Sequence, residues 1–263
     1  MNTPILNKTS SKMLLLIFLI SLIFNKTDAQ TKRQSGTNNN VWFYYIGSHK
    51  LNEKWGIHIE GQFRRSDFLN QWQQILLRSG INYHPTQNIL LTAGYVFAQT
   101  YPYGVYPSGS AFPENRFWQQ IQVRTPLQKM EWVSRLRTEQ RFVNQPVKQA
   151  GGFYQPGDAV YTNRFRLMNR LSIPLNGKKI EPGSTYLSVS DELFVNSGKN
   201  VGMNVFDQNR AIVSLGYFMD RLGRIELGYM FHDVHKSDGI RIERNNTLLL
   251  GLSSNLNWYK KKV

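Results

Sequence analysis

The sequence contains no cysteine, and this absence excludes several classes of protein. Without a thiol the chain cannot form disulfide bonds, bind a metal through thiolates or carry the acylated cysteine of a lipoprotein. Acidic residues are also few, since 17 Asp and Glu against 32 Lys and Arg give a formal net charge of +15. Such a surplus attracts nucleic acid or anionic lipid. Because the arginines are spread along the chain and form no basic run, we expect no nucleic-acid partner.

Long hydrophobic runs are scarce as well. The one clear run is MLLLIFLISLIF at residues 13–24, preceded by two lysines and followed by Thr-Asp-Ala at 27–29. This order of charged, apolar and small residues is typical of a secretory signal. The alternative is a membrane anchor, but a helix needs roughly 20 apolar residues to cross a bilayer. We therefore predict a cleaved signal peptide over residues 1–29, followed by a flexible polar segment over 30–40.

The rest of the chain shows alternation with a period of two. In the stretch 114–142, charged and amide residues such as Arg116 and Gln120 share one face, while Phe117 and Ile121 share the other. This pattern predicts β-strands with one polar and one apolar face. We expect strands at 41–48, 55–65, 71–83, 88–101, 114–124, 131–143, 161–173, 184–195, 207–219, 223–233 and 246–258.

Two architectures fit alternating strands: a secreted β-sandwich, and a membrane barrel with its apolar face outward. Three features favour the barrel. Many segments are longer than globular strands, which cluster near roughly five or six residues. Short and long connections alternate, as they do between the two ends of a membrane barrel. Aromatic residues that suit membrane interfaces lie towards segment ends, at Trp55, Phe63, Tyr83, Tyr101, Trp132, Phe142, Tyr161 and Trp258.

We therefore predict an all-β, antiparallel up-and-down transmembrane β-barrel over residues 41–263. The expected location is the outer membrane of a Gram-negative bacterium, with outer-membrane lipid around the barrel. Eleven segments would leave 41–48 parallel to the strand that closes the barrel, whereas bacterial barrels of one chain normally have an even strand number. About twelve strands are therefore expected, with ten as the fallback.

An ordered run of short motifs also points to a family. It comprises KLNEKWGIHIEGQFR, LLRSGINY, AGYVF, ENRFWQQ, RLRTEQRF, NRFRLMNRLSIPL, DELFVN, FDQNR and IELGYMF. Together these segments, from about residue 42 to 258, resemble the family known as domain of unknown function 2490. The resemblance implies an outer-membrane β-barrel of Gram-negative bacteria and assigns no biochemical activity.

The polar face of the predicted strands carries a band of charge. Its members are Arg64, Glu114, Arg116, Arg135, Arg137, Glu139, Arg141, Arg164, Arg166, Arg170, Glu192 and Arg210. An excess of guanidinium groups in a narrow lumen attracts anions. We expect a narrow pore or lumen-binding protein biased towards small anionic solutes. The alternative is a non-conducting structural or surface-interaction barrel, whose Arg and Glu side chains pair with one another.

The register of the hairpin within 114–142 decides which charges are opposed. Pairing residue 124 with 131 sets Glu114 opposite Arg141 and Arg116 opposite Glu139. A slide by two residues would set Arg116 opposite Arg141, and directly opposed like charges are destabilising. We therefore expect the first register.

Enzymatic chemistry has little support. A lipid-modifying enzyme is the third alternative, with His232 at the outer rim as its candidate. His232 and Asp233 would face opposite sides of a strand, and no Gly-x-Ser-x-Gly motif is present. His58 and Glu60 alone are too few to hold a metal. We expect no catalytic residue, no metal site and no cofactor.

Overall fold

The computed structural model describes residues 33–177 and 179–259, and the predicted signal peptide lies outside them. Within the described residues no helix is long and apolar enough to cross a membrane. The chain forms β1 (Gln34–Lys50), β2 (Trp55–Ser66), β3 (Gln71–Tyr83), β4 (Ile89–Thr100), β5 (Phe112–Leu127), β6 (Met130–Val143), β7 (Pro146–Lys148), β8 (Tyr154–Pro156), β9 (Val160–Pro174), β10 (Thr185–Ser197), β11 (Phe206–Met219), β12 (Gly223–His235) and β13 (Arg241–Ser254).

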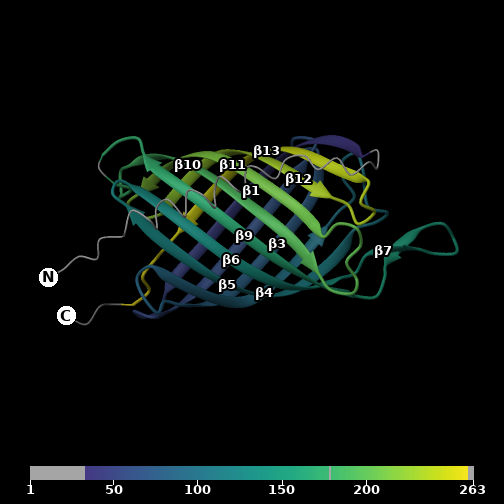
Figure 1. Ribbon diagram of the computed structural model, residues 1–263, viewed down its shortest axis with the longest axis horizontal. Helices are drawn as coiled ribbons and strands as arrows, with labels where there is room; N and C mark the ends of the chain where they lie inside the picture. The colour runs from purple at the N-terminus through teal and green to yellow at the C-terminus, as the bar shows by residue number, and fades with distance from the viewer. Residues whose placement is uncertain (1–32, 178, 260–263) are drawn as a thin grey trace. The chain divides into compact units, whose positions relative to one another are not determined.

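The long strands close into one barrel (Figure 1). Around the barrel their order is β1-β13-β12-β11-β10-β9-β6-β5-β4-β3-β2. The short strands β7 and β8 form a separate hairpin that projects beyond one end of the barrel (Figure 1). The predicted all-β barrel is confirmed.

The closure of the barrel differs from the expectation. The described residues contain eleven barrel strands, and β1 pairs with β13 in parallel, from Gln34 opposite Arg241 to Gly47 opposite Ser254. No twelfth strand was therefore needed near the N-terminus of the described chain. A parallel ladder occupies the backbone N–H and C=O groups of both edges, so an odd number of strands can also close a barrel.

Strand β1 also begins earlier than predicted. Residues 34–40 were expected to be flexible, yet they belong to β1. Their polar side chains find partners on β13: the amide of Asn38 donates to Oδ1 of Asn245 at 2.8 Å. The composition of residues 34–40 alone could not predict this pairing, because the partner strand lies at the other end of the sequence.

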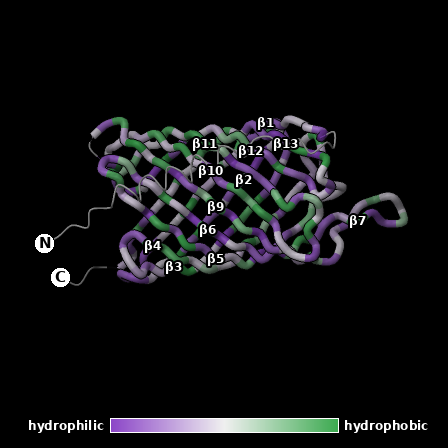
Figure 2. Tube along the Cα trace, viewed as in Figure 1, coloured by the Kyte–Doolittle hydropathy of each residue, from purple (hydrophilic) through white to green (hydrophobic). Residues whose placement is uncertain are grey.

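The barrel has its apolar face outward. Leu77, Ile81 and Leu227 are more than half exposed on the exterior, at 51%, 62% and 62%. Among the described residues, buried polar and charged side chains outnumber buried apolar ones. Figure 2 shows apolar and polar positions alternating along the strands. This is the inverse of a water-soluble sandwich, in which the enclosed face would be apolar.

The two ends of the barrel differ. One end, called here the long-loop end, carries the connections 67–70, 101–111, 144–159, 198–205 and 236–240. The other, the short-turn end, carries 51–54, 84–88, 128–129, 175–184 and 220–222. Two connections depart from the expected alternation of lengths. The connection 67–70 is short although it lies at the long-loop end, and 175–184 is longer than the other connections of the short-turn end.

The predicted register of the β5–β6 hairpin is wrong. Leu127 pairs with Met130, which leaves a two-residue turn and sets Arg116 opposite Arg141. Gln128 in this turn has a φ of 51°, the left-handed conformation that tight hairpin turns require. The turn thus fixes the register. The two arginines tolerate each other because both bind the carboxylate of Glu114.

Candidate functional site

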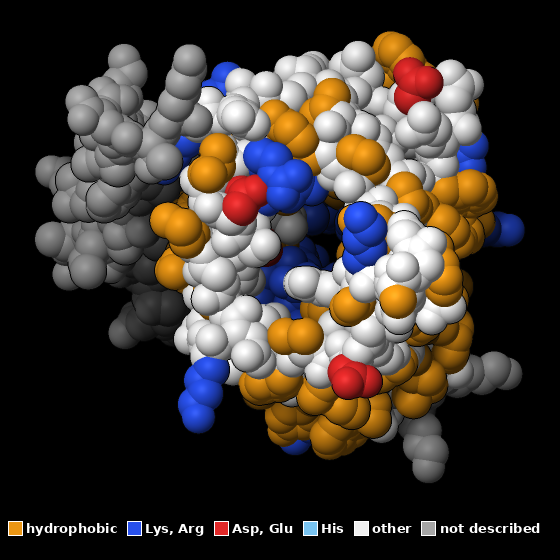
Figure 3. All heavy atoms as spheres, turned by 90° about the vertical axis from the view of Figure 1, so that its right-hand side faces the viewer, with side chains coloured by type: hydrophobic (Ala, Val, Ile, Leu, Met, Phe, Trp, Pro, Cys, Tyr) orange, Lys and Arg blue, Asp and Glu red, His pale blue; other side chains and the backbone are white. Residues whose placement is uncertain are grey.

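The barrel encloses a cavity of about 720 Å³. Tyr106, Gln145 and Lys236 line it near the long-loop end, and its lining extends along the strands to Glu226 and Ser253. Figure 3 looks into the long-loop end and shows a hollow with Lys and Arg side chains inside. The lumen is thus an internal space reached from the end that carries the β7–β8 hairpin.

The structure brings the charge band of the sequence analysis together in this space. The members that line the cavity are Arg64, Glu114, Arg116, Arg135, Arg137, Arg141, Arg164, Arg166, Arg170, Glu192 and Arg210. Glu139 has no exposed side-chain surface, because arginines surround its carboxylate.

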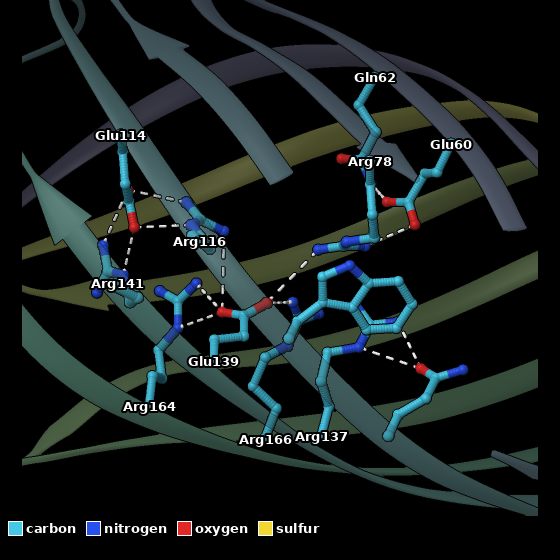
Figure 4. A network of polar contacts seen from close by, with 12 residues as sticks. Glu60, Gln62, Arg78, Glu114, Arg116, Arg137, Glu139, Arg141, Arg164 and Arg166 are labelled. Carbon is cyan, nitrogen blue, oxygen red and sulfur yellow. Dashed lines mark hydrogen bonds and ion pairs between the residues drawn. The ribbon is translucent and has the colours of Figure 1, made fainter. Parts of the chain in front are cut away.

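Glu139 on β6 is the centre of an ion-pair network (Figure 4). Its Oε2 lies 2.5 Å from Nη2 of Arg164, and its Oε1 lies 2.8 Å from Nη1 of Arg166. Arg78 and Arg116 approach the same carboxylate at 3.5 and 3.8 Å. These arginines come from β3, β5 and β9, so one carboxylate links four strands across the interior.

Two further carboxylates each bind a pair of arginines. Glu114 accepts hydrogen bonds from Arg116 at 2.7 and 2.9 Å and from Arg141 at 2.5 and 3.1 Å. Glu192 on β10 binds Arg135 at 2.7 Å and Arg166 at 2.8 Å. Charge-assisted pairs of this kind hold the guanidinium groups in fixed orientations.

Three lumen arginines have no such partner. Arg64, Arg137 and Arg210 form no ion pair within 4 Å with any carboxylate of the described residues.

Neutral glutamine oxygens orient these three guanidinium groups instead. Arg64 donates to Gln62 at 2.5 and 3.0 Å and to Gln74 at 2.7 Å. Arg137 donates to Gln120 at 2.7 and 3.1 Å, and Arg210 to Gln208 at 3.1 Å. The amides therefore position three positive charges without neutralising them.

Aromatic rings support the same guanidinium groups. The Cζ atom of Arg64 lies 3.9 Å from the ring centroid of Trp42, and that of Arg210 lies 5.1 Å from it. Arg137 lies 4.7 Å from the ring centroid of Trp118. A cation held over an aromatic face is stabilised by the ring quadrupole, and this contact uses none of the five N–H donors of a guanidinium group. The glutamine oxygens accept from at most three of the five in each arginine.

A comparison with protein families found a match over most of the barrel. Residues 39–243 match the family described as protein of unknown function (DUF2490). The chain belongs to the DUF2490 family. This confirms the resemblance inferred from the sequence motifs. The search of curated proteins and the search of solved structures found no match.

Sequence reasoning did not place several charged residues of the DUF2490 barrel in the band. Glu60 pairs with Arg78 at 2.5 Å, and Asp207 pairs with Arg164 at 3.0 Å. Glu226, which alternates with apolar neighbours on β12, contacts Arg170. The signal that could have found them is the alternation itself, extended to every strand.

A polar cluster crosses the lumen in the part of the cavity nearer the short-turn end. Tyr44 on β1 and Tyr186 on β10 donate to the carboxylate of Glu226, at 3.2 and 2.6 Å. Arg170 on β9 binds the same carboxylate. This cluster, called here the floor, joins side chains from β1, β9, β10 and β12.

Two histidines, His232 and His58, lie on the lumen side of the barrel among polar and aromatic side chains. His232 is buried in the lumen, where its Nε2 lies 3.0 Å from Oε1 of Gln208 and its ring lies edge-on to Trp42. His58 lies 3.2 Å from Glu60. Within the described residues no three His, Asp or Glu side chains are grouped so that they could hold a metal.

Two residues of the long-loop end have perturbed acidities. Burial, together with the neighbouring Glu243 carboxylate, raises the pKa of the Tyr103 phenol, which donates to that carboxylate at 3.0 Å. Backbone N–H groups of Arg241 and Ile240 lower the pKa of Asp238 to about 2. Both contacts attach a loop of the DUF2490 barrel to the start of β13.

Proposed function

We propose that this protein is an outer-membrane β-barrel of a Gram-negative bacterium that binds small anions in its lumen. The observation that carries the proposal is the set of three guanidinium groups, Arg64, Arg137 and Arg210, that line one cavity without a carboxylate partner. A charge in a narrow, poorly hydrated space interacts with a counter-ion far more strongly than it does in bulk water. The lumen thus offers an anion a stabilisation that solvent does not.

The outer-membrane location is supported by the exterior of the barrel and by the N-terminal sequence. Outward-facing side chains such as Leu77, Ile81 and Leu227 would be costly in water, whereas lipid solvates them. Aromatic residues of neighbouring strands also contact one another on this surface: the rings of Trp55 and Tyr83 lie 4.7 Å apart. The signal-like residues 13–29 are consistent with export.

Binding is favoured over steady conduction because large side chains fill the lumen beyond the cavity. Trp118 and Tyr186 both face inward and have no exposed surface. The floor links Tyr44, Tyr186 and Glu226 across the interior. A barrel of this size is often filled by its own side chains. We therefore expect anions to enter from the long-loop end and to leave by the same route.

A structural barrel is the second candidate, and the network at Glu139 favours it. Four arginines from three strands converge on this one carboxylate, and such pairs specify geometry even where they add little net stability. A purely structural network needs no unpaired guanidinium. Arg64, Arg137 and Arg210 are therefore the residues that separate the two functions.

The decisive experiment measures anion binding directly. Radiolabelled sulfate is dialysed against the protein in lipid nanodiscs, with empty nanodiscs as the blank. We expect binding that weakens at least tenfold in Arg64→Gln and in Arg210→Gln. The control is Arg65→Gln, which removes the adjacent arginine on the exterior face and should leave binding unchanged. Absence of sulfate binding to the unaltered protein would leave the structural barrel.

A planar-bilayer recording completes the test. We expect no steady open-channel current from the unaltered protein, because the floor and Trp118 obstruct the lumen. A steady, ohmic current would replace the binding function with a pore.

A further inference from the structure

The cavity has two chemically different walls. Strands β6 and β9 contribute guanidinium groups, including Arg135, Arg137 and Arg166. On the other side of the closed barrel, the neighbouring strands β11, β12, β13 and β1 contribute apolar side chains to the same cavity. These are Ile212, Met230, Leu249 and Trp42, called here the apolar wall.

The apolar wall is continuous from strand to strand. Ile212 pairs with Met230 across β11 and β12, and Leu249 pairs with Trp42 across β13 and β1. Met230, Leu249 and Trp42 form one buried cluster, against which Ile212 packs. Ile212 itself is only partly buried, so the wall presents apolar surface to the enclosed space.

The wall lies next to the unpaired arginines. Arg210 precedes Ile212 by two residues on β11, so both side chains point inward, and Arg210 lies nearer the long-loop end. Arg64 is the ladder partner of Trp42, whose ring lies against both guanidinium groups. The floor at Glu226 lies beyond the wall, towards the short-turn end. From its mouth inward, the cavity therefore offers positive charge, then apolar surface, then a carboxylate.

This order is not what a binding site for inorganic ions requires. Apolar side chains that face enclosed water gain free energy only when an apolar group covers them. At the floor, the guanidinium of Arg170 already binds Glu226, so it offers no unpaired positive charge for binding in the reverse orientation. A pocket of about 720 Å³ is within the usual size range for organic ligands.

We propose that the ligand of this lumen is an organic carboxylate with a short apolar body. Its carboxylate lies at Arg64 and Arg210, and its hydrocarbon part lies against Ile212, Met230 and Leu249. The proposal rests on the anion-binding function proposed above and names the class of anion.

The test compares three radiolabelled ligands by equilibrium dialysis with the protein in lipid nanodiscs: sulfate, acetate and hexanoate. Each methylene that leaves water on binding raises affinity about fourfold. We therefore expect hexanoate to bind at least tenfold more tightly than acetate. Equal affinities for hexanoate and acetate would overturn the proposal, while bound sulfate would still support the anion site. A different outcome would contradict the anion site itself: hexanoate binds, but neither sulfate nor acetate shows binding that is weakened by Arg64→Gln.

Two pairs of variants assign the ends of the ligand. Ile212→Thr should weaken hexanoate binding several-fold and leave sulfate binding unchanged, because it alters only the apolar wall. Val213→Thr, the adjacent outward-facing residue, is its control. Arg210→Gln should weaken both ligands, with Arg65→Gln as the control. If Ile212→Thr leaves the preference for hexanoate over acetate intact, the apolar wall does not bind the ligand.

Discussion

At the scale of single residues, Glu139 is the side chain on which most of the interior contacts depend. Its carboxylate has no exposed surface and lies within 4 Å of four guanidinium groups. Removing one partner from a buried ionic network leaves uncompensated charge, at a cost of about 3–5 kcal/mol. Without the Glu139 carboxylate, the arginines of β3, β5 and β9 would lose the negative charge that they share.

We therefore expect Glu139→Gln to lower the unfolding free energy by about 3–5 kcal/mol. The matched control on the same strand is Glu131→Gln. Glu131 lies at the short-turn rim, 3.3 Å from Arg124 and 3.1 Å from Arg224, and its loss should cost about 1 kcal/mol or less. Urea unfolding followed by tryptophan fluorescence measures both. Similar losses in the two variants would contradict a central role for Glu139.

The second prediction concerns Arg141. It does not depend on the hairpin register that was expected from the sequence. Arg141 and Glu114 are not ladder partners, yet they form two hydrogen bonds. Arg141→Glu should therefore destabilise the barrel, because two carboxylates would meet in a buried space. Arg141→Gln should be milder, since Arg116 still binds Glu114. The gel mobility shift on heating should occur at a lower temperature for the glutamate variant than for the glutamine variant.

At the scale of elements, the parallel seam between β1 and β13 distinguishes this barrel from an all-antiparallel one. Its outer face carries Asn39 and Asn246, which are ladder partners and are joined by a side-chain hydrogen bond of 3.3 Å. On the inner face, Asn38 and Asn40 both donate to Asn245. These amide contacts on both faces fix the alignment of two strands that are distant in the sequence.

Because the chain lacks cysteine, this seam can be tested by an introduced disulfide. Asn39→Cys combined with Asn246→Cys should form a cross-link under oxidation, since opposed residues of neighbouring strands lie within disulfide reach. The cross-linked barrel should migrate differently on denaturing gels until reductant is added. The pair Asn39→Cys and Leu248→Cys, offset by two residues, should cross-link poorly. A preference for the offset pair would refute the register.

At the scale of the whole molecule, the two ends of the barrel imply an orientation in the proposed membrane. The long-loop end should face the outside, because membrane barrels place short turns on the periplasmic side. Ser237→Cys, exposed in the connection 236–240, should react with an impermeant thiol reagent on intact cells. Gln128→Cys, exposed in the turn of the β5–β6 hairpin, should react only after the outer membrane is opened. The opposite labelling pattern would place the mouth of the cavity in the periplasm.

The sequence by itself determined the faces of the strands. Alternation with a period of two follows from the geometry of an extended chain, and it placed residues such as Arg137, Arg166 and Arg210 on the enclosed face without any tertiary information. The same local signal located the barrel strands of residues 55–235, usually to within two residues at each end.

The tertiary structure decided the pairings. Whether an arginine is neutralised depends on which strands face each other across the lumen, and Arg164 with Asp207, or Arg170 with Glu226, come from distant segments. The β5–β6 register depended on the backbone of a two-residue turn, and the closure of β1 on β13 joined opposite ends of the sequence. Arg64, Arg137 and Arg210 remain unpaired for the same reason: no carboxylate of the described chain reaches them once the barrel is closed.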